Sequence, residues 1–325
     1  MRPLRPFTAL VLLSLSPLSS AAQTSPASTP PPQFPQAAPF DARTAPESAR
    51  QHAQMIRIPG GSYPIGSPDN HPLANRAAMP MHRVAIAPFR IDRTEVTNAQ
   101  FAEFLNALPV KPRGTEPGGN VGPRNIPPEA HRLFLEFSSR PSPYTIVDLD
   151  DEEALIGVID GRFAPNPGFE NHPATETTWA GALAYCRWRG ARLPTEVEWE
   201  AAARGPQGRT FPWGEAQPTT ELAVINRKSG DTVPVGSRPR GATPEGLLDM
   251  AGSMLEWTST LDRPYPYRAD DGREDPALGG ERVVRGGNYV FDDAPERLTT
   301  WNRTFAWRNP ATGHRQIGLR CAAGV

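Results

Sequence analysis

The chain has 325 residues and a net charge of −1, with both signs of charge interspersed along it. This balance gives no electrostatic basis for binding nucleic acid or an anionic membrane surface, so we expect no nucleic-acid partner. The 39 proline and 28 glycine residues interrupt the chain too often for long helices or a doubly wound sheet. We therefore expect an α+β fold with little regular secondary structure and many loops.

The first 22 residues have the layout of a cleavable secretory signal. Two arginines precede an apolar run from Phe7 to Leu18, and the small residues Ser20 to Ala22 follow it. The run is too short for a membrane span, and no later stretch has the roughly 20 apolar residues that a span needs. We expect a mature protein that begins near Gln23 and is secreted or periplasmic.

Residues 23–52 form a linker rich in proline, alanine and serine, which cannot bury enough apolar surface to fold. The remaining residues, 53–325, are expected to form the folded domain. Within it, residues 109–170 have the composition of a variable insertion, in which 144–150 and 154–160 are predicted strands around an acidic turn. The insertion has two open interpretations, a loop that shapes a binding site and a decoration of the surface.

Three segments are predicted to be helical: Asn98–Leu108, Thr178–Arg189 and Thr195–Arg204. Thr97 is a candidate N-cap for the first, and Thr195 with Glu198 predicts a capping box for the third. The predicted strands are short: Met55–Ile58, His82–Ile91 and Arg282–Arg285.

The two cysteines, Cys186 and Cys321, are far apart in sequence. In an oxidising compartment such a pair is more often a structural disulfide than a reactive site. Neither has a neighbouring cysteine or histidine, so the spacing does not predict a zinc site.

A series of short motifs covers residues 55 to 323 and resembles, in the same order, the formylglycine-generating-enzyme-like (sulfatase-modifying factor) family. Each motif is weak alone, but their order along the chain makes the resemblance specific. The motifs are Pro59–Gly66, Phe89–Asn98, His172–Trp179, Tyr185–Trp188, Arg192–Trp199, Phe211–Gly214, Gly246–Gly252, Glu256-Trp257, Val284–Gly287 and Gly318–Ala322.

The resemblance implies one domain with a C-type-lectin-like core, closed by a disulfide between Cys186 and Cys321. It also implies structural calcium ions. The better-defined calcium site would use the carboxylates of Asp249 and Glu256 and the backbone carbonyls of Gly252 and Met254, a set of hard oxygen ligands. A second site would use Asn226, Asp231 and the backbone carbonyls of Arg227 and Val233.

Formylglycine generation in this family requires two cysteines, five residues apart, that bind Cu(I) after the Gly-Gly turn. Counting from Gly286-Gly287, these positions are Phe291 and Glu296 in this chain. Neither residue can act as a thiolate, so we expect no copper at a cysteine pair and no formylglycine-generating activity.

Two explanations of this replacement remain open. In the first, Glu296 is a catalytic acid or base whose pKa is raised in a partly apolar pocket. An oxidative or maturation role on a peptide-like or phenolic substrate would follow, as in the pyoverdine-maturation (PvdO-like) branch of the family, which acts on a siderophore precursor. The pocket residues would be Phe291, Asp292, Asp293, Arg297, Trp301 and Trp307.

In the second explanation the domain is a non-enzymatic module that binds an envelope protein partner, for example in secretion-system signalling. A third relative of the family, the ergothioneine-type iron enzyme, needs clustered histidines, whereas the six histidines here are scattered. We expect His172 and five of the tryptophans, such as Trp199, to be structural. Arg285 and Arg320 are expected to pair with a buried carboxylate such as Glu196 or Glu198.

Overall fold

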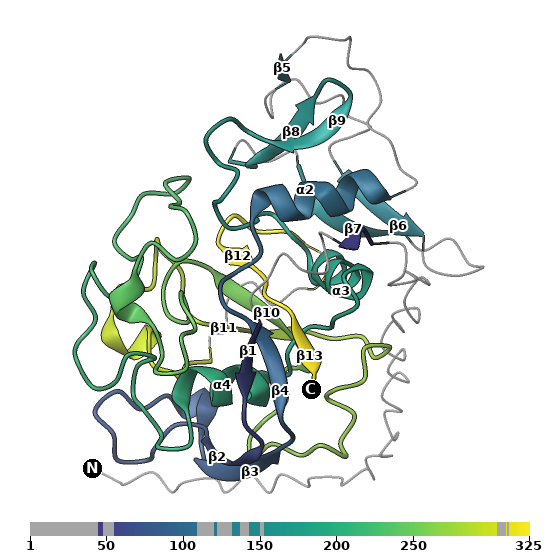
Figure 1. Ribbon diagram of the computed structural model, residues 1–325. Coiled ribbons are helices and arrows are strands. Elements are labelled where there is room, and N and C mark those ends of the chain that lie inside the picture. Colours follow the sequence, from purple (N-terminus) through teal and green to yellow (C-terminus); the bar gives the residue numbers. More distant parts are fainter. Residues whose placement is uncertain are drawn as a thin grey trace, which may run out of the picture. The chain divides into compact units, whose positions relative to one another are not determined.

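The computed structural model describes residues 45–47, 55–108, 120–121, 132–136, 143–149, 153–303, 310 and 312–325 (Figure 1). The expected signal peptide and nearly all of the expected linker lie outside these ranges, as do parts of the 109–170 insertion and Trp307. No helix among the described residues is long and apolar enough to cross a membrane.

Three short α-helices lie within the three segments predicted to be helical, and Thr97 and Thr195 are the N-caps that the sequence indicated. Helix α2 covers Asn98–Ala107, α3 covers Trp179–Trp188 and α4 covers Glu196–Arg204. Each begins directly after a threonine whose side chain accepts a hydrogen bond from a backbone N–H of the first turn. Helix α4 has the predicted capping box and ends at Gly205, whose positive φ of 67° breaks the helical path.

The strands form several small sheets rather than one large one. Strand β4 (Phe89–Asp92) lies between β1 (Met55–Ile58) and β13 (Ala322–Gly324), and both pairs are antiparallel (Figure 1). Strand β10 (Leu255–Leu261) lies between β11 (Arg282–Arg285), which is antiparallel to it, and β12 (Ile317–Gly318), which is parallel. The other strands are β2 (Gly61–Ile65), β3 (His82–Ile86), β5 (Asn120–Val121), β6 (Arg132–Glu136), β7 (Pro143–Asp148), β8 (Ile156–Ile159) and β9 (Arg162–Pro165).

The prediction of one continuous strand from His82 to Ile91 is wrong. The segment forms β3, which pairs with β2, and then β4, which pairs with β1 and β13. Pro88 lies between the two strands and has no N–H for a sheet ladder, which explains the break. The apolar positions shift by one residue at the break, from Val84 and Ile86 to Phe89 and Ile91, so the sequence pattern contained a signal that the prediction missed.

Part of the expected insertion belongs to the main core. Ile146, Val147, Val158 and Phe163 are buried in the same apolar cluster as the aromatic residues of α2 and α3. Gly181 of α3 packs directly on β7, because a Cβ atom at this glycine would lie 1.9 Å from the carbonyl oxygen of Ile146. Strand β7 therefore packs on α3 and β9 on α2, so these strands are not only a surface decoration.

The disulfide between Cys186 and Cys321 is confirmed, with both residues fully buried and their Cα atoms 5.6 Å apart. Cys186 is on α3, and Cys321 directly precedes β13. The bond ties the middle of the domain to its final strand. Because these are the only cysteines of the chain, neither can provide a thiolate elsewhere.

Candidate functional site

The segment that would carry the family's cysteine pair begins at the turn after β11. Gly286 and Gly287 have φ values of 105° and 75°, which side-chain-bearing residues rarely adopt. Asn288 then accepts hydrogen bonds from the N–H groups of Val290 and Phe291, and its own N–H donates to Asp292. These local bonds fix the backbone that leads to the short 3₁₀-helix η6 (Pro295–Arg297), which carries Glu296.

The expected apolar surroundings of Glu296 are not formed by the described residues, and this part of the prediction is wrong. Glu296 is exposed on η6, and Phe291 is 59 % exposed. Trp301 is buried, with its indole N–H 3.3 Å from the carbonyl oxygen of Leu73. Asp292 is also buried and accepts from Asn288, and burial raises its pKa. The residues are close in sequence, but they point to different environments.

A cavity of about 360 Å³ lies beside Glu296, on the side facing the 3₁₀-helix η2 (Arg76–Ala78). Most of its lining residues are polar or charged and none is aromatic, and Asn75 and Arg76 enter it from a segment that the sequence did not associate with the site. The lining residues are Ala74, Asn75, Arg76, Ala77, Glu296, Arg297, Asn302 and Arg303.

Two side-chain amides hold the two walls of this cavity together. The amide nitrogen of Asn75 donates to the side-chain oxygen of Asn302, 2.7 Å away, and also to the carbonyl oxygen of Arg303. The amide nitrogen of Asn302 in turn donates to the carbonyl oxygen of Arg297, 2.9 Å away. The positions of η2 and η6 are therefore set by direct bonds and not by loop packing alone.

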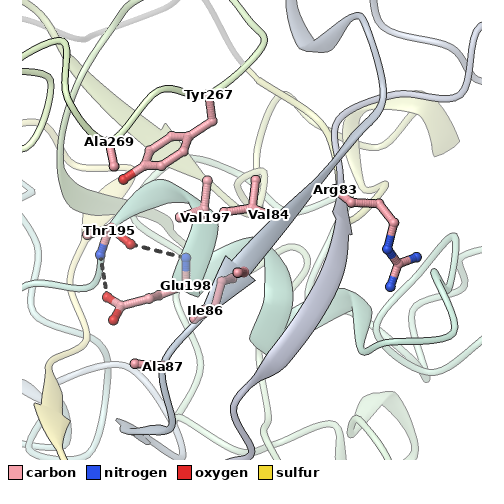
Figure 2. Close-up of a pocket in the computed structure, with 10 residues that line it drawn as sticks. Arg83, Val84, Ile86, Ala87, Thr195, Val197, Glu198, Tyr267 and Ala269 are labelled. Carbon is pink, nitrogen blue, oxygen red and sulfur yellow. Dashed lines mark hydrogen bonds between the residues drawn. The ribbon is translucent and has the colours of Figure 1, made fainter.

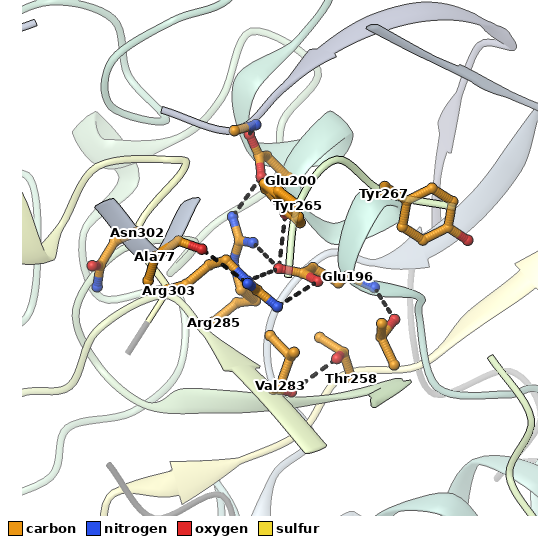
Figure 3. A network of polar contacts seen from close by, with 12 residues as sticks. Ala77, Glu196, Glu200, Thr258, Tyr265, Tyr267, Val283, Arg285, Asn302 and Arg303 are labelled. Carbon is orange, nitrogen blue, oxygen red and sulfur yellow. Dashed lines mark hydrogen bonds and ion pairs between the residues drawn. The ribbon is translucent and has the colours of Figure 1, made fainter. Parts of the chain in front are cut away.

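Arg303 connects the cavity to a buried network of charges. Figure 3 shows the carboxylate of Glu196 between the guanidinium groups of Arg285 and Arg303. The predicted pairing of Arg285 with Glu196 is therefore confirmed. Arg285 also pairs with Glu200, at 2.9 Å. Burial would raise the pKa of Glu196, but the two arginines outweigh it and leave this pKa below its ordinary value. The network also contains Arg204, Asp262 and the Tyr265 hydroxyl.

This network is balanced in charge. It contains three arginines (Arg204, Arg285 and Arg303) and three carboxylates (Glu196, Glu200 and Asp262). Such an arrangement fixes geometry without requiring a further ion. We regard it as a scaffold beneath the cavity.

A second buried cluster is not balanced in charge, and it contains the two acidic residues predicted to bind calcium. Asp249 and Glu256 are buried close to Glu95, and Arg320 is the cation that acts on all three carboxylates. Arg320 pairs with Glu256, so its predicted pairing with a buried carboxylate is confirmed. The partner is neither of the two carboxylates suggested, Glu196 and Glu198; Glu198 pairs with Arg192.

Glu95 is the residue of this cluster that sequence reasoning missed. Neither of its carboxylate oxygens has a hydrogen-bond partner of good geometry within the described part of the chain. Burial and the neighbouring Asp249 carboxylate raise the pKa of Glu95 well above its ordinary range. The sequence signal that could have identified Glu95 is its position, since it is an acidic residue two positions before Thr97, the N-cap of an apolar helix. The oxygen donors and the excess negative charge suit a calcium ion, although no three such side chains are already arranged as a metal-binding group in the described ranges.

The predicted second calcium site has a different environment. The carboxylate of Asp231 forms an ion pair with Arg227 at 2.7 Å and is about half exposed. Asn226 has a left-handed φ of 56°, and the N–H of Arg227 donates to the carbonyl oxygen of Tyr289. The acidic ligand is therefore already neutralised, and this geometry does not favour a cation.

A further cavity of about 400 Å³ lies between β3 and the start of α4. In Figure 2 the side chains of Val84, Val197 and Tyr267 gather at one side of it, whereas Arg83 points away. Glu198 lines the cavity, but its carboxylate accepts from the Thr195 N–H and pairs with Arg192. None of the residues predicted for the functional site lines this cavity.

Comparison with known proteins matches the part of the chain that contains the sequence motifs described above. The model of the sulfatase-modifying factor enzyme 1-like domain matches residues 41–325. The chain belongs to this sulfatase-modifying factor family. The family assignment and the α+β fold predicted from the sequence are confirmed. The match begins before residue 53 and so includes the end of the expected linker.

Two relatives in the family show its chemical range. The formylglycine-generating enzyme of Mycobacterium tuberculosis is 32 % identical over 309 residues, covering 83 % of this chain and 97 % of that protein. The hercynine oxygenase of Mycolicibacterium smegmatis is 36 % identical over 287 residues, covering 83 % of this chain and 61 % of that protein. The structure of PvdO from Pseudomonas aeruginosa shares the fold, with a TM-score of 0.54, 24 % identity, and coverage of 83 % of this chain and 94 % of PvdO.

Proposed function

We propose that this member of the family carries out an oxidative or maturation step on a peptide-like or phenolic substrate, such as a siderophore precursor, and does not generate formylglycine. The observation that carries the proposal is the polar cavity beside Glu296. Glu296, one of the two positions at which we expect the family's cysteine pair, lines this cavity, and the bonds from Asn75 and Asn302 hold its walls together. One of the two relatives described above, the hercynine oxygenase, is named for an oxidation, which supports an oxidative role here.

In this proposal Glu296 takes a proton from the substrate, and Phe291, whose side chain is exposed five residues earlier in the chain, contacts an aromatic group of the substrate. Both cysteines of the chain are in the disulfide, so an oxidation requires an electron acceptor other than a thiol–copper pair. The acceptor would be dioxygen or a group that a partner supplies.

The test is an incubation of the mature protein in air with tyrosine-containing peptides and phenolic siderophore precursors. Mass spectrometry would then detect the loss of two hydrogens from the substrate, which reduce dioxygen to hydrogen peroxide. Glu296→Gln should abolish turnover and leave the melting temperature nearly unchanged, because the side chain is exposed. Glu221→Gln, at an exposed position that lines neither cavity, is the matched control. Equal turnover by wild type and Glu296→Gln would refute the catalytic role.

A second candidate, a binding module for an envelope protein, is favoured by the exposure of Glu296 and Phe291. An exposed carboxylate lacks the burial that usually tunes a catalytic acid or base. This candidate predicts that Glu296→Gln is silent in every turnover assay and that changes within 109–170 abolish capture of the partner.

We also propose a structural calcium ion at the cluster of Glu95, Asp249 and Glu256. Arg320 offsets the charge of Glu256, so Glu95 and Asp249 are the carboxylates left to neutralise the ion. We further propose export by the N-terminal signal. The buried excess of negative charge supports the ion. Glu95 adds a third carboxylate to the two expected from the sequence. The order of charged, apolar and small residues before Gln23 supports export. N-terminal sequencing of the secreted protein tests export, since an N-terminus at Met1 would contradict it.

A further inference from the structure

Two of the arginine side chains that line the cavity beside Glu296 are not in ion pairs within the described part of the chain. Arg76 and Arg297 are both exposed, and neither forms a hydrogen bond or an ion pair through its side chain within the described part of the chain. Arg297 acts electrostatically on Asp292, but the Asp292 carboxylate is already hydrogen-bonded to Asn288. Both guanidinium groups are therefore available to a ligand.

The third arginine of the lining is not available in this way. The guanidinium of Arg303 pairs with Glu196 and Asp262 and donates to the carbonyl oxygen of Ala77 (Figure 3). Its charge is offset by those carboxylates, and its burial keeps it in place. Arg303 is therefore a fixed, neutralised part of the cavity wall, and Arg76 and Arg297 provide the positive charge that is available to a ligand.

The charges of the cavity match a ligand that carries a single negative charge. Arg76 and Arg297 contribute two positive charges, and Glu296 contributes one negative charge, which leaves one positive charge uncompensated. A carboxylate neutralises this charge and accepts hydrogen bonds from guanidinium groups in a planar arrangement. A phosphate dianion would overcompensate it and would be repelled by Glu296.

We propose that the cavity recognises a carboxylate group on its ligand through Arg76 and Arg297. The bonds from Asn75 to Asn302, and from Asn302 to the backbone of Arg297, hold the two arginine-bearing segments at a set separation. The inference rests on the proposed function only in taking this cavity as the substrate site. It specifies the substrate class as a peptide-like or phenolic compound with a free carboxylate.

The experiment compares two probes that differ only in this group, N-acetyl-L-tyrosine and N-acetyl-L-tyrosine amide. Binding to the mature protein is measured by ligand-observed NMR titration. The acid should bind at least roughly tenfold more tightly than the amide, the ratio expected for charge-assisted hydrogen bonds. Arg76→Gln and Arg297→Gln should each remove this preference. Arg240→Gln, at an exposed position outside both cavities, should retain it.

Equal affinity for the acid and the amide, or no binding of either, would overturn the proposal. Inorganic phosphate that displaces N-acetyl-L-tyrosine more strongly than acetate does would also overturn the proposal, because the single uncompensated positive charge of the cavity favours a carboxylate over a phosphate dianion. Retention of the preference in both arginine variants would place the carboxylate elsewhere. Because no turnover is measured, the preference for the acid can hold even if Glu296→Gln proves silent, so this result and the test of catalysis are independent.

Discussion

Arg320 holds the carboxylate of Glu256 through two hydrogen bonds, from Nε to Oε2 at 2.6 Å and from Nη2 to Oε1 at 2.7 Å. The next residue, Cys321, is in the disulfide, and its N–H donates to Asp92 at 2.9 Å. Asp92 also forms a buried ion pair with Arg189. A covalent bond and two buried ion pairs therefore fix the same short segment before β13, and the contribution of each can be measured.

Replacing both cysteines, Cys186→Ala with Cys321→Ala, should lower the free energy of unfolding by about 2–5 kcal/mol. The disulfide closes a long loop, with 135 residues of sequence separation, and so restricts the unfolded chain strongly. Urea unfolding followed by tryptophan fluorescence measures the loss. If the wild type retains its midpoint after a thiol reductant has demonstrably reduced the bond, the disulfide does not contribute as described.

Arg285→Met should lower the free energy of unfolding by about 3–5 kcal/mol, because it leaves Glu196 and Glu200 buried without one of their cations. Adding Glu200→Gln should recover part of this loss by removing one uncompensated charge. Arg268→Met, at an exposed ion pair with Asp270, should change stability by less than about 1 kcal/mol. A loss at position 285 no larger than at position 268 would show that the buried network is not needed for stability.

The local features of this fold were predictable from the sequence, whereas the long-range pairings were not. Helices α2, α3 and α4 begin after Thr97, Thr178 and Thr195 because an N-cap acts within its own first turn. The partner of Arg320 depends on how β10 and β12 pair, which no local pattern encodes. Glu198 was a reasonable candidate, but its carboxylate is used by its own capping box and by Arg192.

In the candidate site, too, local features were predictable from the sequence and long-range contacts were not. The positions of the missing cysteines came from the family's spacing after Gly286-Gly287, and the turn is present. The apolar pocket around Glu296 was inferred from closeness in sequence, but neighbouring side chains on an irregular segment point in different directions. Arg76 reaches the cavity through the contact of Asn75 with Asn302, which are 227 residues apart. Only the folded structure brings this arginine to the site.

Gly181→Ala should lower the free energy of unfolding by about 1–3 kcal/mol or more, because the added Cβ would overlap the carbonyl oxygen of Ile146. The clash is with backbone, so α3 or β7 must move. Gly324→Ala is the matched control, since its Cβ would meet no atom within 4 Å. Thermal unfolding of the two variants checks the prediction, and equal melting temperatures would mean that α3 does not pack on β7 through this glycine.

Removal of calcium should make stability depend on pH through Glu95. Its folded-state pKa is raised by burial and by Asp249, so the unfolded state ionises first as the pH rises. The contribution of Glu95 to stability is therefore complete below its ordinary pKa and is lost as the pH rises toward the folded-state value. In a chelator, the melting temperature of the wild type should fall as the pH rises above the ordinary glutamate pKa of about 4.3.

Glu95→Gln should reduce this fall, because glutamine is neutral at every pH; the remaining slope comes from Glu256, whose pKa burial also raises. Added calcium should raise the melting temperature of the wild type above pH 6 and have a smaller effect on Glu95→Gln, since a bound cation favours the ionised carboxylates. Differential scanning calorimetry at several pH values separates these cases. A wild type that does not respond to calcium would remove the ion from the proposal, whereas a pH dependence unchanged by Glu95→Gln would show that Glu95 does not titrate in the folded protein.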